Sequence, residues 1–258
     1  TVMESTMADQ FGTDWRAALG YEKDALVPYA VAALLNYLHE TQKHGVERIK
    51  TVQNYADAQY MRLSPVTRAN LELTETMRGR EKRGTLLWVL DKTETSMGKR
   101  LLRSWIEQPL VDAEAINRRL SAVQALYTAN MARADLKDAL SHVFDIERLT
   151  TRILYGSATP REVKALGDTC AMLPQVKAQA AACGAPLLTQ LADQIDLLED
   201  VLQNIQTALV DDPPANMKDG GAIRAGFNSE VDELRDIMHG GKGYLSNLEA
   251  RYREETGI

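Results

Sequence analysis

A regular apolar repeat is the strongest constraint on how this chain can fold. Between residues 188 and 209, apolar side chains recur at alternating steps of three and four: Leu188, Leu191, Ile195, Leu198, Leu202, Ile205 and Leu209. Such steps keep one face of an α-helix apolar, so the repeat predicts a single helix roughly 32 Å long. Because the apolar stripe is narrow, we expect a partner helix to cover it.

Helix-start signals are frequent in the rest of the chain. Ser64 precedes Pro65, Asp112 precedes an apolar run, and Thr159 precedes Pro160 in a capping-box pattern with a glutamate three residues later. Such side chains accept hydrogen bonds from the first N–H groups of a helix, and proline fits its first turn. With apolar spacing, these signals predict helices over residues 26–43, 64–75, 96–108, 112–127, 135–143, 145–155, from 159 onward and 229–257.

The predicted helix after Asp112 has a pronounced apolar face. Ile116, Leu120, Val123 and Tyr127 follow one another at steps of four and three residues. That spacing is typical of the side of a helix that packs in a core. We therefore expect these four side chains to be buried.

Two segments depart from helical spacing. Residues 49–63 place Tyr60, Met61 and Leu63 at near-alternating positions after a β-branched run, which predicts one or two short strands. Residues 222–227, within a turn-rich connector, also suit a short strand. The predicted fold class is therefore mainly α, a multi-helix domain with long helices and a short β element near its N-terminal part.

Composition limits the functional class. Thirty Lys and Arg against 36 Asp and Glu give a net charge of −6, so the chain as a whole lacks a basic surface for nucleic acid. No apolar run reaches 18 residues and no leader pattern opens the chain, so we expect no membrane partner and a cytoplasmic location. Cys170 and Cys183 lie in apolar or alanine-rich surroundings, which predicts buried, reduced thiols.

Enzyme motifs are missing from the sequence. Gly98-Lys99 and Gly241-Lys242 resemble the end of a phosphate-binding loop, but the glycine needed five residues before each is Thr93 in one case and Asp236 in the other. The four histidines are scattered, and neither a nucleophile elbow nor a dinucleotide-binding turn occurs. We therefore predict no catalytic residue, no cofactor site and no metal site in this chain.

A basic loop follows the helix predicted from Ser64. Arg78, Arg80, Lys82 and Arg83 outweigh one glutamate between two glycines. Clustered guanidinium groups suit a phosphate backbone or an acidic partner. The same four charges also suit a turn that is simply solvated, and the sequence leaves both readings open.

Two motifs in residues 62–110 carry a family resemblance. The segments TRANLE and LDKTETSMGKRLLRSWIEQPL match the patterns TRxNLE and LDxTxTxMGxRLLxxWxxxPL, and the stretch resembles the core, or lever, domain of the MutS family of DNA mismatch repair proteins. The resemblance implies packing and turn roles for the motif residues, with Met97 and Trp105 in the core, Asp91 as a cap and Gly98 at a close approach. The motif positions are Thr67, Arg68, Asn70, Leu71, Glu72, Leu90, Asp91, Thr93, Thr95, Met97, Gly98, Arg100, Leu102, Trp105 and Pro109.

The resemblance also implies a domain organisation. Residues 1–45 would be the C-terminal end of a connector domain, 46–228 the core or lever domain, and 229–258 a long lever helix leading into a clamp domain. We expect the chain to be a fragment, with mismatch-reading and ATPase domains outside it. In that case Tyr244, Leu245, Leu248 and Tyr252 would lack the returning helix that normally packs on them.

The function that the resemblance implies is structural and allosteric. The whole protein would be a homodimer that recognises mispaired bases in duplex DNA, uses ATP and Mg²⁺ in its ATPase domain and recruits a MutL-type partner, while this chain itself would be no enzyme. A second hypothesis is a self-sufficient all-α interaction scaffold whose apolar repeat at residues 188–209 binds another protein's helix.

Overall fold

The computed structural model describes residues 2–22, 25–42, 45–52 and 59–256, without the side chains of residues 239, 242–250 and 254–256. Contacts between Cα atoms divide the chain into two compact units, Thr1–Ala58 and Gln59–Ile258. The sequence-based boundary lies at 45/46, whereas the contacts place the division at 58/59. The two units are described separately below.

The first unit is a small helical cluster. Met7 and Trp15 are its largest fully buried side chains, and Ala32 and Leu35 pack against them. Gln10 ties the cluster together, because its Nε2 donates to the carbonyl oxygens of two later residues at 2.7 and 2.8 Å. The elements are α1 (Val2–Phe11), α2 (Trp15–Leu19), α3 (Val27–Thr41) and a 3-10 turn, η1 (Val46–Arg48).

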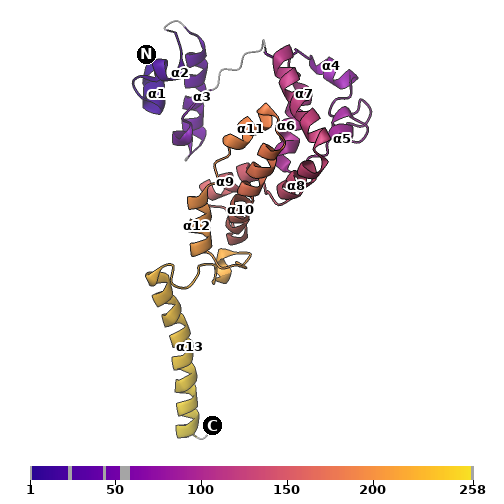
Figure 1. The fold of residues 1–258 in the computed structure, drawn as a ribbon. Helices are drawn as coiled ribbons and strands as arrows, with labels where there is room; N and C mark the ends of the chain where they lie inside the picture. The colour runs from indigo at the N-terminus through magenta and orange to yellow at the C-terminus, as the bar shows by residue number, and fades with distance from the viewer. Residues whose placement is uncertain (1, 23–24, 43–44, 53–58, 257–258) are drawn as a thin grey trace. The chain divides into compact units, whose positions relative to one another are not determined.

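The second unit is built around the long helix α10 (Pro160–Ala182), which contacts α8, α9, α11 and α12 (Figure 1). The capping box predicted at its start is confirmed, since the Thr159 hydroxyl accepts from the N–H of Glu162 and the Glu162 carboxylate accepts from the N–H of Thr159. The remaining elements are α4 (Pro65–Asn70), α5 (Leu86–Leu90), α6 (Ser96–Glu107), α7 (Ala113–Thr128), α8 (Asn130–Ser141), α9 (Ile146–Leu154), α11 (Pro186–Asp193), α12 (Glu199–Ala208), η3 (Met217–Asp219) and α13 (Ser229–Thr256).

One face of α10 supplies much of the core. Thr169, Cys170, Leu173 and Val176 are buried along it. Thr169 satisfies its hydroxyl by donating to the carbonyl of Ala165 and accepting from the N–H of Phe144, so this buried polar group has both bonds it needs. Burial raises the pKa of the Cys170 thiol. The prediction that both cysteines are buried and free is confirmed.

The apolar repeat at residues 188–209 does not form one helix, so that prediction is wrong. The structure ends α11 at Asp193 and begins α12 at Glu199, with Leu198 in the left-handed region at φ 51°. The Asp196 side chain accepts from the N–H of Leu198 at 3.1 Å, which is the local bonding by which aspartate competes with a helix. Both short helices pack on α10. Ile205 and Leu209 of the repeat are buried, whereas Leu191 is 48% exposed.

The predicted strands are also absent from the described residues. In the first segment, Tyr60 forms an isolated antiparallel bridge with Leu110, while residues 53–58 lie outside the described part. In the second, Leu209 and Ile223 form another isolated bridge. Each segment supplies backbone pairing at one position only, and the mainly α fold class is confirmed.

The apolar face predicted on α7 is mostly exposed. Leu120 and Val123 are exposed and Tyr127 keeps 71% of its surface accessible, while Ala122 is the buried side chain of this helix. Helix α7 packs on α8 and α11. Of the four side chains expected in the core, Ile116 alone is half-buried, so the prediction that all four are buried is wrong.

Helix α13 begins as the sequence indicates and continues through its glycines. The Asn228 side chain accepts from the N–H of Val231 at 3.1 Å and so caps the helix. The side chains of Tyr244, Leu245 and Leu248 lie outside the described residues, whereas Tyr252 is half exposed. None of the described helices has both the length and the hydropathy of a membrane-spanning segment.

The contact between α10 and α12 gives a test of the packing. A Cβ atom added at Gly167 would lie 2.8 Å from Cγ2 of buried Ile205, a branch next to the backbone that has little freedom to move. We expect Gly167→Val to lower the free energy of unfolding by about 1–3 kcal/mol, the usual cost of overpacking. Chemical denaturation measures this. The control is Gly240→Val, at a helical glycine with nothing within 4 Å, which should shift stability by less than about 0.5 kcal/mol. Equal effects would contradict the contact.

Candidate functional site

The first motif forms a helix followed by a sharp turn. Ser64 caps α4, with its hydroxyl accepting from the N–H of Thr67 at 3.0 Å, as predicted. The helix ends at Asn70 rather than near residue 75, because Glu72 takes a left-handed conformation at φ 47°. The Glu72 carboxylate holds this turn by accepting from the N–H of Met77 at 2.8 Å.

The basic loop is fastened to α5 by a buried threonine that the sequence analysis missed. Thr85 caps α5 by accepting from the N–H of Trp88 at 3.1 Å, and its hydroxyl donates to the carbonyl of Lys82 at 2.8 Å. Thr85 is among the most deeply buried residues of the chain. Thr85 stands directly before the apolar run Leu86–Leu90, and a threonine at that position is a typical N-cap signal that the sequence already contained.

Asp91 joins α5 to α6. Its carboxylate accepts from the N–H and the hydroxyl of Thr93, at 3.3 and 2.6 Å, and pairs with the Lys99 ammonium at 2.7 Å. The hydrogen bonds from Lys99 and then Thr93 lower the pKa of Asp91 to about 2. Thr95 caps α6 by accepting from the N–H of Gly98 at 3.0 Å, and a Cβ atom at Gly98 would lie 3.0 Å from the Thr95 hydroxyl.

Arg100 connects α6 to α9. Its two terminal nitrogens bind both carboxylate oxygens of Asp145, at 2.7 and 2.9 Å, and it also pairs with Glu147. Asp145 is the N-cap of α9, where it accepts from the N–H of Arg148 at 3.3 Å. The Arg100 guanidinium lowers the pKa of Asp145, and the two carboxylates raise the pKa of Arg100 above its usual range. One planar cation therefore fixes a helix start 45 residues away in sequence.

Several apolar motif residues are not in a core. Trp105 is 40% exposed, with the Arg119 guanidinium 3.7 Å from its ring centroid, so the expected burial of this residue is wrong. Leu71 and Leu90 are exposed as well, whereas Met97 and Leu102 are half-buried. The Pro109 carbonyl accepts from the N–H of Met61 at 2.7 Å. An amphipathic segment can leave its apolar side exposed where another surface binds it. The sequence alone does not distinguish such a face from one that is buried in a core.

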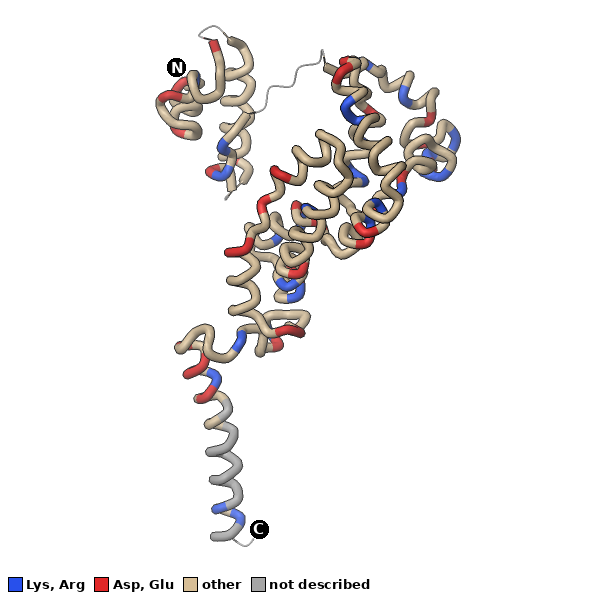
Figure 2. Tube along the Cα trace, in the orientation of Figure 1, with Lys and Arg blue, Asp and Glu red and all other residues tan. Residues whose placement is uncertain are grey.

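The predicted basic residues gather on the loop between α4 and α5, where Figure 2 shows a concentration of Lys and Arg. Arg78, Arg80, Lys82 and Arg83 are all exposed. Arg80 has a positive φ of 51°. The Arg83 guanidinium lies 6.0 Å from the ring centroid of Trp88.

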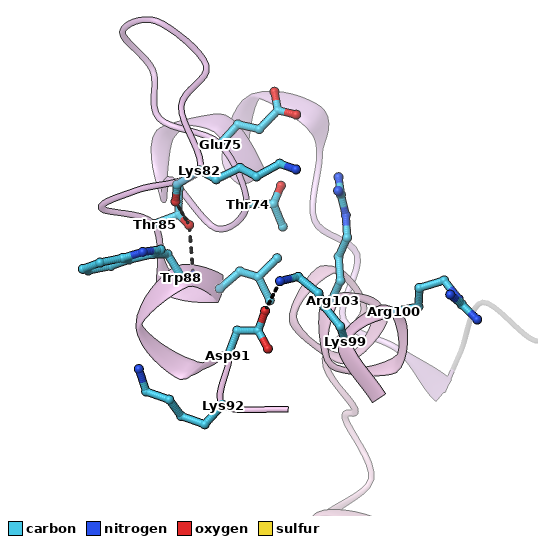
Figure 3. A pocket seen from close by; sticks show the side chains of 11 residues that line it. Thr74, Glu75, Lys82, Thr85, Trp88, Asp91, Lys92, Lys99, Arg100 and Arg103 are labelled. Carbon is cyan, nitrogen blue, oxygen red and sulfur yellow. Dashed lines mark hydrogen bonds and ion pairs between the residues drawn. The ribbon is translucent and has the colours of Figure 1, made fainter. Parts of the chain in front are cut away.

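Two clefts lie beside this loop and share Thr74 and Glu75 in their walls. The first, about 460 Å³, lies between α5, α6 and the basic loop, where side chains of Lys82, Lys99 and Arg103 extend inward from different segments (Figure 3). Its lining is Thr74, Glu75, Lys82, Thr85, Leu87, Trp88, Asp91, Lys92, Lys99, Arg100 and Arg103. The second, about 580 Å³, is lined by Pro65, Arg68, Ala69, Thr74, Glu75, Thr76, Met77 and Arg80.

The side chains of this region are rich in cations, and several of them hold helices in place. Five Lys and Arg residues line the first cleft against two carboxylates. Within the described residues, no group of three or more His, Cys, Asp or Glu side chains has an arrangement that could hold a metal ion. The arrangement can bind an anion and fix helix positions.

Comparisons with known proteins agree on one family. The family model described as MutS domain III matches residues 66–255. The DNA mismatch repair protein MutS of Alkaliphilus oremlandii is 42% identical over 250 residues, which are 97% of this chain and 28% of that protein. The MutS proteins of Symbiobacterium thermophilum and Brevibacillus brevis are 42% and 39% identical, over 98% and 100% of this chain and 29% and 30% of their own lengths. The chain thus spans less than a third of these relatives.

The bonds of Asp91 predict how stability depends on pH. Its folded-state pKa of about 2 lies below the ordinary value of 3.8, so the stabilisation is complete above that ordinary value and is lost as the pH falls towards 2. We expect Asp91→Asn to remove part of this acid dependence. Thermal melts of both proteins from pH 6 to 2 measure it, and the two melting curves should converge at the acid end. Curves that stay parallel over the whole range would exclude the assigned role.

Proposed function

This chain belongs to the MutS family of DNA mismatch repair proteins, and from that premise we propose that it is the core, or lever, segment, which couples DNA recognition to an ATPase domain elsewhere in the protein. In this proposal residues 1–45 are the end of the connector domain, 46–228 the core or lever domain and 229–258 the helix that leads to the clamp. A mechanical role of this kind requires firm joints between rigid elements.

The observation that carries the proposal is the joint between α6 and α9. Arg100 binds Asp145 with two parallel hydrogen bonds. Bidentate pairing of this type fixes direction as well as distance, which a lysine at the same position could not do. A displacement of α6 would therefore reorient the start of α9, and α9 packs directly on α10.

A second joint continues from α10 towards α13. Helix α12 packs on α10, and its last residues pair with the segment before α13, where Leu209 bridges Ile223. The Ile223 carbonyl then accepts from the Arg235 guanidinium at 3.0 Å, so the segment is bonded to the first turns of α13. Helices transmit displacement with little bending, and close-packed interfaces tend to shift between discrete arrangements. This sequence of contacts suits a lever.

The remaining parts of the proposal concern the whole protein. We propose that it binds mismatched duplex DNA, uses ATP and Mg²⁺ in a domain outside this chain, forms a homodimer, recruits a MutL-type partner and acts in the cytoplasm. The competing scaffold hypothesis requires the apolar repeat at residues 188–209 to bind another protein's helix. The repeat is divided between two helices, and its Ile205 and Leu209 are already buried within this unit.

A first test uses the chain alone. We expect the purified 258-residue chain to release no phosphate from ATP above background in the presence of Mg²⁺ and DNA, because the proposal places ATP hydrolysis in another domain. A coupled phosphate-release assay measures this. Turnover that survives repeated purification would contradict the proposal.

A second test examines coupling in a full-length protein. The chain replaces the matching segment of the Alkaliphilus oremlandii relative, with and without Arg100→Ala. We expect Arg100→Ala to reduce the effect of mismatched DNA on the ATPase rate several-fold while ATP affinity stays unchanged, because the proposal places nucleotide binding in another domain.

The matched control for the coupling test is Lys164→Ala. It removes a pair with Asp168 that lies within a single helix and joins no two elements. This variant should keep the response to mismatched DNA. The proposal fails if both variants behave alike, or if Arg100→Ala keeps full coupling.

A further inference from the structure

An unpartnered arginine lies in the second cleft. The Nε atom of Arg68 is buried and has no hydrogen-bond partner among the described residues. A buried guanidinium N–H left unsatisfied costs free energy, so its presence calls for an explanation. Arg68 lines the cleft together with Arg80, so two guanidinium groups share one hollow.

Arg80 is held in a conformation that is costly for its residue type. Its φ of 51° lies in the left-handed region, which glycine adopts freely and which side-chain-bearing residues rarely do. A glycine at this position would fold the loop with less strain. The arginine is therefore better explained by its side chain than by the turn it occupies.

Three of the five cations that line the first cleft already pair with carboxylates, which limits the charges available to a ligand. Lys99 pairs with Asp91, and Arg100 and Arg103 pair with carboxylates outside the cleft. Among the described residues, the lining cations of the two clefts that lack a carboxylate partner are Arg68, Arg80, Lys82 and Lys92, against one unpaired acid, Glu75. Two adjoining clefts therefore carry a local excess of positive charge in a chain whose net charge is −6.

An aromatic ring completes the surface. Trp88 lines the first cleft and is 51% exposed, and Figure 3 shows its indole at the edge, on the side where Lys92 also lies. A basic track beside an exposed aromatic face is the arrangement that binds single strands, because phosphates meet the cations while a base stacks on the ring. An acidic peptide would also meet these cations, but it would supply no base to stack on the exposed ring of Trp88.

From these observations we infer that the two clefts form a binding site for single-stranded nucleic acid. Arg68, Arg80 and Lys82 contact successive phosphates, and Trp88 stacks on a base. The clefts adjoin at their shared wall of Thr74 and Glu75, so an extended chain of phosphates that reaches both fits better than a single anion. The inference concerns this chain alone and does not depend on its proposed role as a lever.

The test is a titration of the 258-residue chain into a fluorescein-labelled oligothymidylate of about 12 nucleotides, followed by fluorescence anisotropy. We expect a dissociation constant of about 10⁻⁵ M at low salt, in the usual range of sequence-independent binding. A plot of log K against log salt should have a slope of about −2, because about 0.7 counterions are released per phosphate neutralised on a single strand and three side chains contact phosphates.

Substitutions at two residues separate binding from folding. Arg80→Gly removes a charge and relieves the backbone, so it should weaken binding about tenfold while the melting temperature stays equal or rises. Trp88→Ala should also weaken binding about tenfold through lost stacking, whereas Trp88→Phe should retain most of the affinity.

Matched controls lie elsewhere in the second unit. Lys218→Glu changes an exposed lysine in η3, and Tyr127→Ala removes an exposed aromatic ring from α7. Neither should alter affinity by more than about twofold, whereas Lys82→Glu should reduce it at least tenfold.

Competition distinguishes the class of ligand. Unlabelled oligothymidylate should displace the probe at micromolar concentration, whereas pyrophosphate should do so only at millimolar concentration. The inference is overturned by absent binding, by equal losses in the controls, or by unchanged affinity in both Arg80→Gly and Trp88→Ala. Displacement by polyglutamate as effective as that by the oligonucleotide would assign the clefts to an acidic peptide and would also overturn it.

Discussion

Burial of one face of α10 is the interaction on which the second unit depends. Its neighbours α9, α11 and α12 are short, and a short helix is marginal in water unless its apolar side is covered. Helix α10 provides that cover through Cys170, Leu173 and Val176, and Gly167 lets α12 approach closely. The capping box at Thr159 fixes the residue at which this central helix starts. It thereby helps to determine which side chains of α10 face the helices packed on it.

Polar bonds then connect the packed core to the motif-bearing segment. Arg100 reaches the cap of α9, and Asp91 fixes α6 against α5 through Lys99 and Thr93. These bonds are directional but partly exposed, so each contributes less free energy than the burial on α10. Their role is to determine orientation, because a bidentate or doubly accepting carboxylate allows few relative positions of two helices.

Sequence reasoning located the helix starts well and the core less well. Ser64, Asp112 and Thr159 were predicted from chemistry confined to four residues, and each caps the expected helix. The failures have two causes. A local turn held by Asp196 splits the repeat at residues 188–209, and periodicity alone cannot tell the mostly exposed apolar face of α7 from a buried one. The basic loop was visible in the sequence, but its two clefts depend on α6 and on Arg68, which only the fold brings together.

Several departures from local rules lie in the segment that carries the family motifs. Two of the three described non-glycine residues with a positive φ, Glu72 and Arg80, are there, and Arg68 has a buried nitrogen without a hydrogen-bond partner. Along α10, by contrast, the buried Thr169 is fully bonded. Residues that lower stability tend to be retained where function requires them, so several of them in one segment indicate a functional requirement there. Packing on α10 does not explain these residues, because they lie outside it, in the loop and the clefts. A ligand or a covering surface that pairs with their cations would explain them.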